Sequence, residues 1–205
     1  MPTDFQVVYI PDSQLKQKAD SFLARYHETG TIPVPIEKII EFQLKLDIIP
    51  VHRLRRDWDT DAWLTCDMTA IYVDQYEQEA YSNRYRFSLA HEIAHAVLHQ
   101  RVYHALGFND ITSWKKAQTE FPQDDYGQLE WQAYVFAGLV LVPTHHLTRE
   151  CHLVVEEVKS RGIRLNADSD FMRRTIAKKV AARFAVSGQV IEKRLDKEGW
   201  LVGDD

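Results

Sequence analysis

The chain has 205 residues, 45% of them hydrophobic and 27% charged, and its formal net charge is -5. This composition is typical of a globular protein with a buried core, and the charge gives no reason to expect nucleic acid or an anionic membrane as the main partner. Two distant cysteines, Cys66 and Cys151, exclude a disulfide scaffold and favour a reducing compartment. The chain starts without a signal-like segment, and its longest apolar run, VFAGLVLVP, is too short to cross a bilayer, so we expect a soluble cytoplasmic protein.

The first half of the chain predicts two helices followed by a small sheet. Apolar residues at helical spacing predict a helix capped by Ser13 and a second helix over 36–46 with Phe42 facing inward. A short run rich in β-branched residues predicts a strand over 47–54, and two further short runs, over 61–66 and 69–75, predict a strand pair. Strands that lie between helices indicate an α+β fold with the sheet on one side of the helices.

The second half of the chain is expected to be helical. The predicted order is a long helix over 84–102, an irregular polar and aromatic connection over 104–128, helices over 128–142 and 144–159, and two tail helices broken at 186–188. Between residues 171 and 202, eight Lys or Arg stand against three Asp or Glu, so the tail is locally basic.

The long helix carries the motif H-E-x-x-H, formed by His91, Glu92 and His95. Residues four apart on an α-helix lie roughly 6 Å apart on one face, so both imidazoles can hold one metal ion. Glu92 is rotated about 100° from His91, where its carboxylate can take a proton from a water beside the ion. On a helix that is otherwise apolar, the histidines need a metal ion or another polar partner, because burying an unpaired polar group costs free energy.

His99 extends the same helix but is not predicted to be a ligand. It lies about 12 Å along the axis from His91, too far for the same ion on a regular helix. We expect a packed or hydrogen-bonded residue at the helix end.

A catalytic zinc site usually has three protein ligands, so a third is required. Glu130 is the leading candidate, because small residues on its helix, Ala133 and Ala137, allow close packing on the helix of His91. A solvated carboxylate that stabilises the start of its helix is an equally good interpretation of Glu130. The other candidates for the third ligand are Asp124, Asp125 and His104.

Four segments together resemble the ImmA/IrrE family of metallopeptidases. YRFSLAHEIAHAVLH is similar to the H-E-x-x-H helix of the family, and LEWQAYVFAGLVLVP is similar to its E-x-E-A-x-x-F-A-x-x-L-L-x-P helix. VAARFAVSGQVIEKRL matches a common tail, and IPVPIEKIIEFQLKLDIIPV resembles the opening helix and strand. The pieces occur in the family's order and cover most of the chain from about Ile32 onward.

The resemblance implies a zincin-like domain over 1–165, with a small mixed or antiparallel sheet of about three strands, and a helix-turn-helix-like appendage over 166–205 packed on it. It implies that zinc is held by His91, His95 and Glu130 and that Glu92 is the catalytic base. Members of the family typically cleave a helix-turn-helix repressor and thereby release transcription, in a mobile element or a stress response. Manganese or iron also suits two histidines and a carboxylate.

This chain departs from the family pattern at two places. Gln132 stands where the family has a second acidic residue, which favours Glu130 as the ligand. The interval between His95 and Glu130 is also longer than in the pattern, which places an insertion over 105–127, where it could shape or cover the site.

A peptidase also needs donors for the oxyanion of its transition state. The candidates are Tyr72, Tyr134, His145 and His146, for each of which a structural role is the alternative. Tyr72 is of most interest, because we expect it on an edge strand beside the metal helix, where a peptide could add as a further strand.

Two other functions compete with the peptidase. The basic tail has the outline of a helix-turn-helix and predicts, as the alternative, a DNA-binding regulator. Its second helix, however, offers few side chains that read bases, which favours a helical pair packed on the peptidase over nucleic acid as the main partner. The third interpretation is a metal-binding but inactive partner protein, such as one half of a toxin–antitoxin pair.

Overall fold

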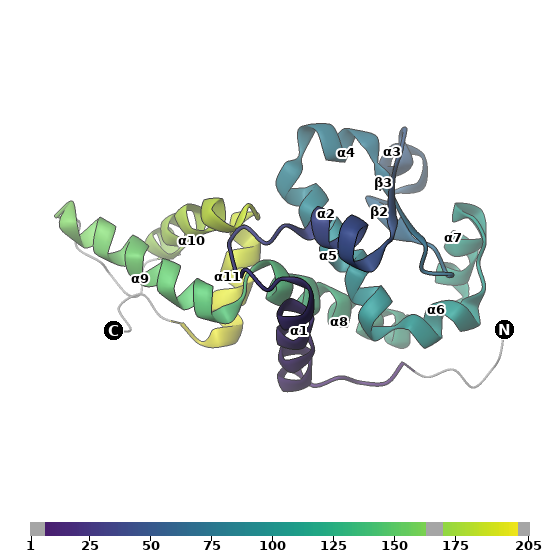
Figure 1. Cartoon of the computed structure of the whole chain (residues 1–205), viewed down its shortest axis with the longest axis horizontal. Helices are drawn as coiled ribbons and strands as arrows, with labels where there is room; N and C mark the ends of the chain where they lie inside the picture. Colours follow the sequence, from purple (N-terminus) through teal and green to yellow (C-terminus); the bar gives the residue numbers. More distant parts are fainter. Residues whose placement is uncertain (1–6, 163–169, 201–205) are drawn as a thin grey trace.

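The computed structural model describes residues 7–162 and 170–200, and it has the predicted α+β architecture (Figure 1). The helices are α1 Asp12–Tyr26, α2 Ile36–Lys38, the π-helix η1 Ile39–Leu44, α3 Leu54–Trp58, α4 Gln75–Ala80, α5 Ser82–Leu98, α6 Gln100–Leu106, α7 Ile111–Glu120, α8 Gln123–Leu141, α9 Thr144–Ser160, α10 Asp170–Phe184 and α11 Gly188–Glu198. The predicted boundary between domains, at 165–166, lies outside the described residues. Among those residues, no helix is both long and apolar enough to span a membrane.

A mixed sheet of three strands forms the smaller layer, as predicted. The strands β1 Asp47–Val51, β2 Ala62–Leu64 and β3 Ala70–Asp74 lie in the order β1-β3-β2, with β1 parallel and β2 antiparallel to β3. Tyr72 is paired on both sides, with Ile49 and with Trp63. Its predicted place on an edge strand is therefore wrong, because β3 is the central strand and β2 is the edge that faces α5.

Helices α5 and α8 form the centre of the molecule and pack against each other (Figure 1). Leu89 and Ile93 of α5 and Ala133 and Ala137 of α8 are completely buried. The two alanines have no side chain beyond Cβ, which lets the helix backbones approach closely. The predicted close packing of these two helices is confirmed, and it sets the distance between their polar residues.

Two details of the first helices differ from the prediction. Helix α1 begins at Asp12 with Pro11 in the capping position and no side-chain cap, so Ser13 is not the cap. The helix predicted over 36–46 is a short α-helix that continues as a π-helix, and Phe42 is 62% exposed rather than inward. The wider turn of a π-helix rotates its side chains away from the positions that α-helical spacing gives them.

The segment predicted to be an irregular connection is instead mostly helical. Helix α7 begins with a capping box, in which the Asp110 carboxylate accepts from the backbone N–H of Ser113 and the Ser113 hydroxyl accepts from the backbone N–H of Asp110. Helix α8 also begins earlier than predicted, directly after Pro122. Asp110 and Ser113 of this segment therefore start a helix rather than prevent one, and α8 begins without a side-chain cap.

The Asp110→Ala variant is expected to lower the free energy of unfolding measurably, because the start of α7 loses its cap. The Asp110→Asn variant keeps a side-chain acceptor and is expected to stay close to the wild type. Urea denaturation measures both. Equal losses in the two variants would show that the carboxylate acts through its charge rather than as a cap.

The C-terminal helices α10 and α11 pack against α9 and α8, with the predicted break between them. An ideal Cβ on Gly138 of α8 would lie 3.4 Å from Cδ of Arg194, so α11 approaches α8 closely there. Five of the eight basic residues of the tail pair with carboxylates: Arg173 with Asp196, Lys179 with Glu157, Arg183 with Glu150, Arg194 with Glu198 and Lys197 with Asp12. These pairs reduce the positive field that the tail could present to a nucleic acid.

Candidate metal centre

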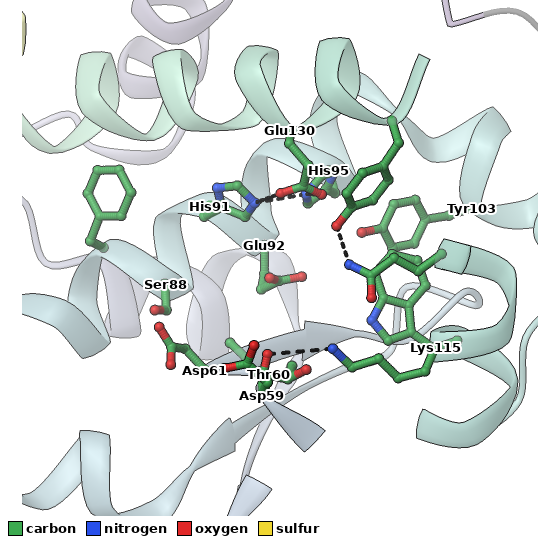
Figure 2. A pocket seen from close by; sticks show the side chains of 15 residues that line it. Asp59, Thr60, Asp61, Ser88, His91, Glu92, His95, Tyr103, Lys115 and Glu130 are labelled. Carbon is green, nitrogen blue, oxygen red and sulfur yellow. Dashed lines mark hydrogen bonds and ion pairs between the residues drawn. The ribbon is translucent and has the colours of Figure 1, made fainter. Parts of the chain in front are cut away.

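Helices α5 and α8 bring His91, His95 and Glu130 together at one point (Figure 2). The Nε2 atoms of the two histidines lie 3.1 Å apart. Glu130 places Oε2 3.1 Å from Nε2 of His91 and Oε1 3.6 Å from Nε2 of His95. Of the described residues with His, Cys, Asp or Glu side chains, these three form the group whose ligand atoms lie close enough to share an ion.

The three ligand atoms fit a small divalent cation. Nitrogen and oxygen atoms bound at 2.0–2.2 Å to a tetrahedral ion lie roughly 3.3 to 3.6 Å from one another. The two Nε2 atoms lie 3.1 Å apart, and Glu130 approaches His91 to 3.1 Å with one oxygen and His95 to 3.6 Å with the other, so the nearest separations come close to this range. Two neutral imidazoles and one carboxylate are also a donor set that zinc accepts.

The histidines differ in how their surroundings affect their charge. Burial lowers the pKa of His95 well below its ordinary value, and the nearby His91 and His99 act in the same direction. Burial also opposes charge on His91, but the hydrogen bond and negative charge of Glu130 outweigh it and raise the pKa of His91. Glu130 therefore supplies negative charge to a site in which His95 is buried and His91 is half-buried.

Glu92 lies beside the three ligand atoms, facing the same space (Figure 2). Its Oε2 atom accepts a hydrogen bond from the backbone N–H of Leu64, at 2.9 Å, on the outer edge of β2. Burial raises the pKa of Glu92 to about 7, and the charge of Glu130 acts in the same direction, while His91 and the Leu64 bond oppose the rise. The edge strand thus holds a carboxylate whose proton affinity is raised by its buried position.

These groups line a pocket of about 280 Å³. One wall is the chain around β2, including Asp59, Thr60 and Asp61, and the opposite wall comes from α7 and the start of α8. The Lys115 ammonium reaches across to the carbonyl of Asp59, at 3.5 Å (Figure 2). The insertion predicted over 105–127 therefore forms one side of the entrance to the site.

The structure does not bring the predicted oxyanion donors into this pocket. Tyr72 stacks on Trp63, with ring centres 5.0 Å apart, and Tyr134 packs against Phe87. His145 is exposed on α9, and neither it nor the two tyrosines line the pocket. The neighbouring His146 is buried and hydrogen-bonded to the carbonyl of Gly30.

Two tyrosines that the sequence analysis did not select do line the pocket, Tyr103 and Tyr126. Burial raises the pKa of both phenols, so both keep their protons at neutral pH. Tyr126 lies one helical turn before Glu130, and an earlier start of α8 would have identified it. The hydroxyl of Tyr126 accepts a hydrogen bond from the Gln118 amide of α7.

The other candidates for the third ligand lie elsewhere. Asp125 accepts a hydrogen bond from the backbone N–H of Val7, and the side chains of Asp124 and His104 are exposed. His99, as expected, is a buried, hydrogen-bonded residue at the end of α5. At the start of α5, Arg84 forms an ion pair with Asp61, one of the residues that line the pocket.

Comparisons with known proteins agree with this arrangement. A family model for the IrrE N-terminal-like domain, a peptidase family, matches residues 75–196. A solved structure of a Mycobacterium tuberculosis transcriptional regulator is similar in fold, with a TM-score of 0.55 and 15% identity over 92% of this chain and 47% of that one. This chain thus spans about half of that regulator, and no curated protein matches it. Since the family model covers more than half of the chain, the chain belongs to the ImmA/IrrE family of metallopeptidases, whose members use a metal cofactor and act on protein substrates.

Proposed function

We propose that the chain is a zinc-dependent endopeptidase that cleaves a helix-turn-helix transcriptional repressor and so relieves repression. The proposal is carried by the meeting of His91, His95 and Glu130, whose ligand atoms lie within 4.8 Å of one another, with the carboxylate of Glu92 beside them. The repressor substrate is taken from the family resemblance. A repressor substrate also places the activity in the cytoplasm.

In this mechanism His91, His95 and Glu130 hold the ion. A divalent cation at this position supplies a Lewis acid that polarises the scissile carbonyl and acidifies a water molecule. Glu92 accepts the proton of the attacking water and then donates it to the leaving amine. The hydrogen bond from Leu64 fixes the Glu92 carboxylate during both transfers and leaves its second oxygen directed at the pocket.

The phenols of Tyr103 and Tyr126 are the oxyanion donors that we propose in place of Tyr72, Tyr134 and His145. Both line the pocket, and their raised pKa values keep their hydroxyl protons available. Gln118 donates to the Tyr126 hydroxyl, whose own proton is directed at the Glu130 carboxylate and would have to turn to a substrate oxygen.

The DNA-binding alternative has less support. Five of the eight basic residues of the tail pair with carboxylates, which lowers the charge available to a phosphate backbone, and Arg194 is buried and bonded to Glu198 and Thr144. Helix α11 instead packs against α8, the helix that carries Glu130, and α10 packs against α9.

Cleavage of a repressor by the zinc-loaded protein tests the proposed substrate. Purified helix-turn-helix repressors from the same genome are incubated with the protein and analysed by mass spectrometry for new termini. We expect one repressor to be cut at a defined bond, with cleavage lost on adding a chelator and restored by zinc. Binding of zinc without cleavage of any of them would contradict the proposed substrate class.

A further inference from the structure

A buried chain of hydrogen bonds leads from the metal centre to the N-terminal segment. Nδ1 of His95 lies 3.0 Å from Nδ1 of His99, and Nε2 of His99 lies 3.0 Å from Oε1 of Gln132. The Gln132 amide in turn donates to the backbone carbonyl of Val8, at 2.9 Å. His95, His99 and Gln132 are 1%, 3% and 0% exposed, so these three side chains are shielded from water, whereas Val8 at the end of the series is exposed.

The backbone carbonyl of Val8 determines which atom donates and which accepts in each of these hydrogen bonds. A carbonyl can only accept, so the NH₂ group of Gln132 faces Val8 and its oxygen faces His99. His99 must therefore carry its proton on Nε2, and a neutral His99 then has a lone pair on Nδ1. That lone pair accepts from Nδ1–H of His95, which leaves the lone pair of His95 on Nε2.

We infer that His99 and Gln132 are positioning residues that hold His95 in its Nδ1–H tautomer, with the Nε2 lone pair directed at the metal centre. This inference rests on the proposed metal site. The opposite tautomer of His95 would place a proton on Nε2, 3.1 Å from Nε2 of His91, where the ion is to be bound. Hydrogen bonds to the second nitrogen of a histidine ligand fix its orientation and tautomer in this way.

The position of His99 depends on the end of α5. The helix stops at Leu98, and His99 separates it from α6, with its backbone N–H still bonded to the carbonyl of His95. Its ring can then lie between the ring of His95 and the side chain of Gln132 on α8. The Gln132 amide accepts a hydrogen bond from His99 with its oxygen and donates one to the carbonyl of Val8 with its nitrogen. An ionised carboxylate could accept from His99 but has no proton to donate to Val8.

The direct test is the tautomeric state of the histidines in the metal-free protein, read from the nitrogen chemical shifts of ¹⁵N-labelled wild type. We expect His95 to be protonated on Nδ1 and His99 on Nε2 before any metal is added. His95 protonated on Nε2, or His99 protonated on Nδ1, would overturn the inference. The test needs no variant and no activity, so it decides the inference even if the wild type binds no metal and the proposed function fails.

Zinc affinity provides the second test. Replacing Gln132 by Met removes the acceptor for His99 and is expected to weaken zinc binding, at most by the roughly 10- to 100-fold that is usual when a group bonded directly to a histidine ligand is removed. Gln132→Glu keeps an acceptor and should bind zinc nearly as well as the wild type. His99→Phe retains a ring of similar size without nitrogens and should resemble Gln132→Met.

Gln128→Met is the matched control, because Gln128 donates to the carbonyl of Val7 on the same N-terminal segment but does not contact His99. It is expected to loosen the segment and leave zinc affinity unchanged. If Gln128→Met weakened zinc binding as much as Gln132→Met, the effect would come from the segment and the inference would be wrong. Thermal unfolding of each metal-free variant confirms that the folded protein is being compared.

Discussion

Glu92→Gln is expected to lower kcat/KM for peptide cleavage by about 100- to 10,000-fold, the usual contribution of a positioned acid–base group. The amide keeps the shape of the side chain and can still accept the hydrogen bond from Leu64, but it cannot take a proton from water. The zinc content should stay at the wild-type level, because the ligand atoms come from other residues. Cleavage assays and metal analysis on the same preparation measure both quantities.

Glu79→Gln provides the matched control for this change. Glu79 is an exposed residue at the end of α4, so its replacement removes one negative charge without touching the pocket. Full activity in Glu79→Gln and loss in Glu92→Gln would separate catalysis from general electrostatics. If Glu92→Gln cleaved peptides as fast as the wild type, Glu92 would not be the catalytic base. If the variant released transcription as the wild type does but cleaved nothing, the inactive-partner interpretation would be favoured.

Glu130→Gln is expected to weaken zinc binding by more than about 100-fold. Loss of a direct ligand exceeds the 10- to 100-fold loss found when a group hydrogen-bonded to a ligand is removed. The neutral amide also removes the negative charge that faces two imidazoles. Competition with a chromophoric chelator measures the dissociation constant.

Asp124→Asn is the control for Glu130→Gln. Asp124 is an exposed carboxylate in the first turn of the same helix, so its loss changes the charge of α8 but not the metal centre. We expect wild-type affinity in this variant. Wild-type affinity in Glu130→Gln would instead identify a different third ligand, to be sought in the insertion over 105–127.

The sequence predicted most of the site because its parts are local. The spacing of His91 and His95 depends only on helix geometry, and the small residues of α8 indicate which face meets α5. The α+β architecture and the three strands followed from periodicity in the same way. These predictions required no knowledge of contacts between distant segments.

The predictions that failed required such knowledge. Tyr72 was expected at a sheet edge, because the sequence of one strand does not determine which strands lie on either side of it. Tyr126 was missed because the predicted start of α8 was too late. The hydrogen bonds of His99 depend on the end of one helix, a side chain of another and a carbonyl near the N-terminus. Only the folded chain brings these three together.

The zinc content of the purified protein tests the central claim most directly. The wild type and a variant with both His91 and His95 replaced by Ala are equilibrated with zinc, dialysed and analysed for metal and protein. We expect about one zinc ion per chain in the wild type and none in the variant. A wild type that retains no zinc, or a variant that retains as much as the wild type, would contradict the metal centre and the peptidase mechanism built on it.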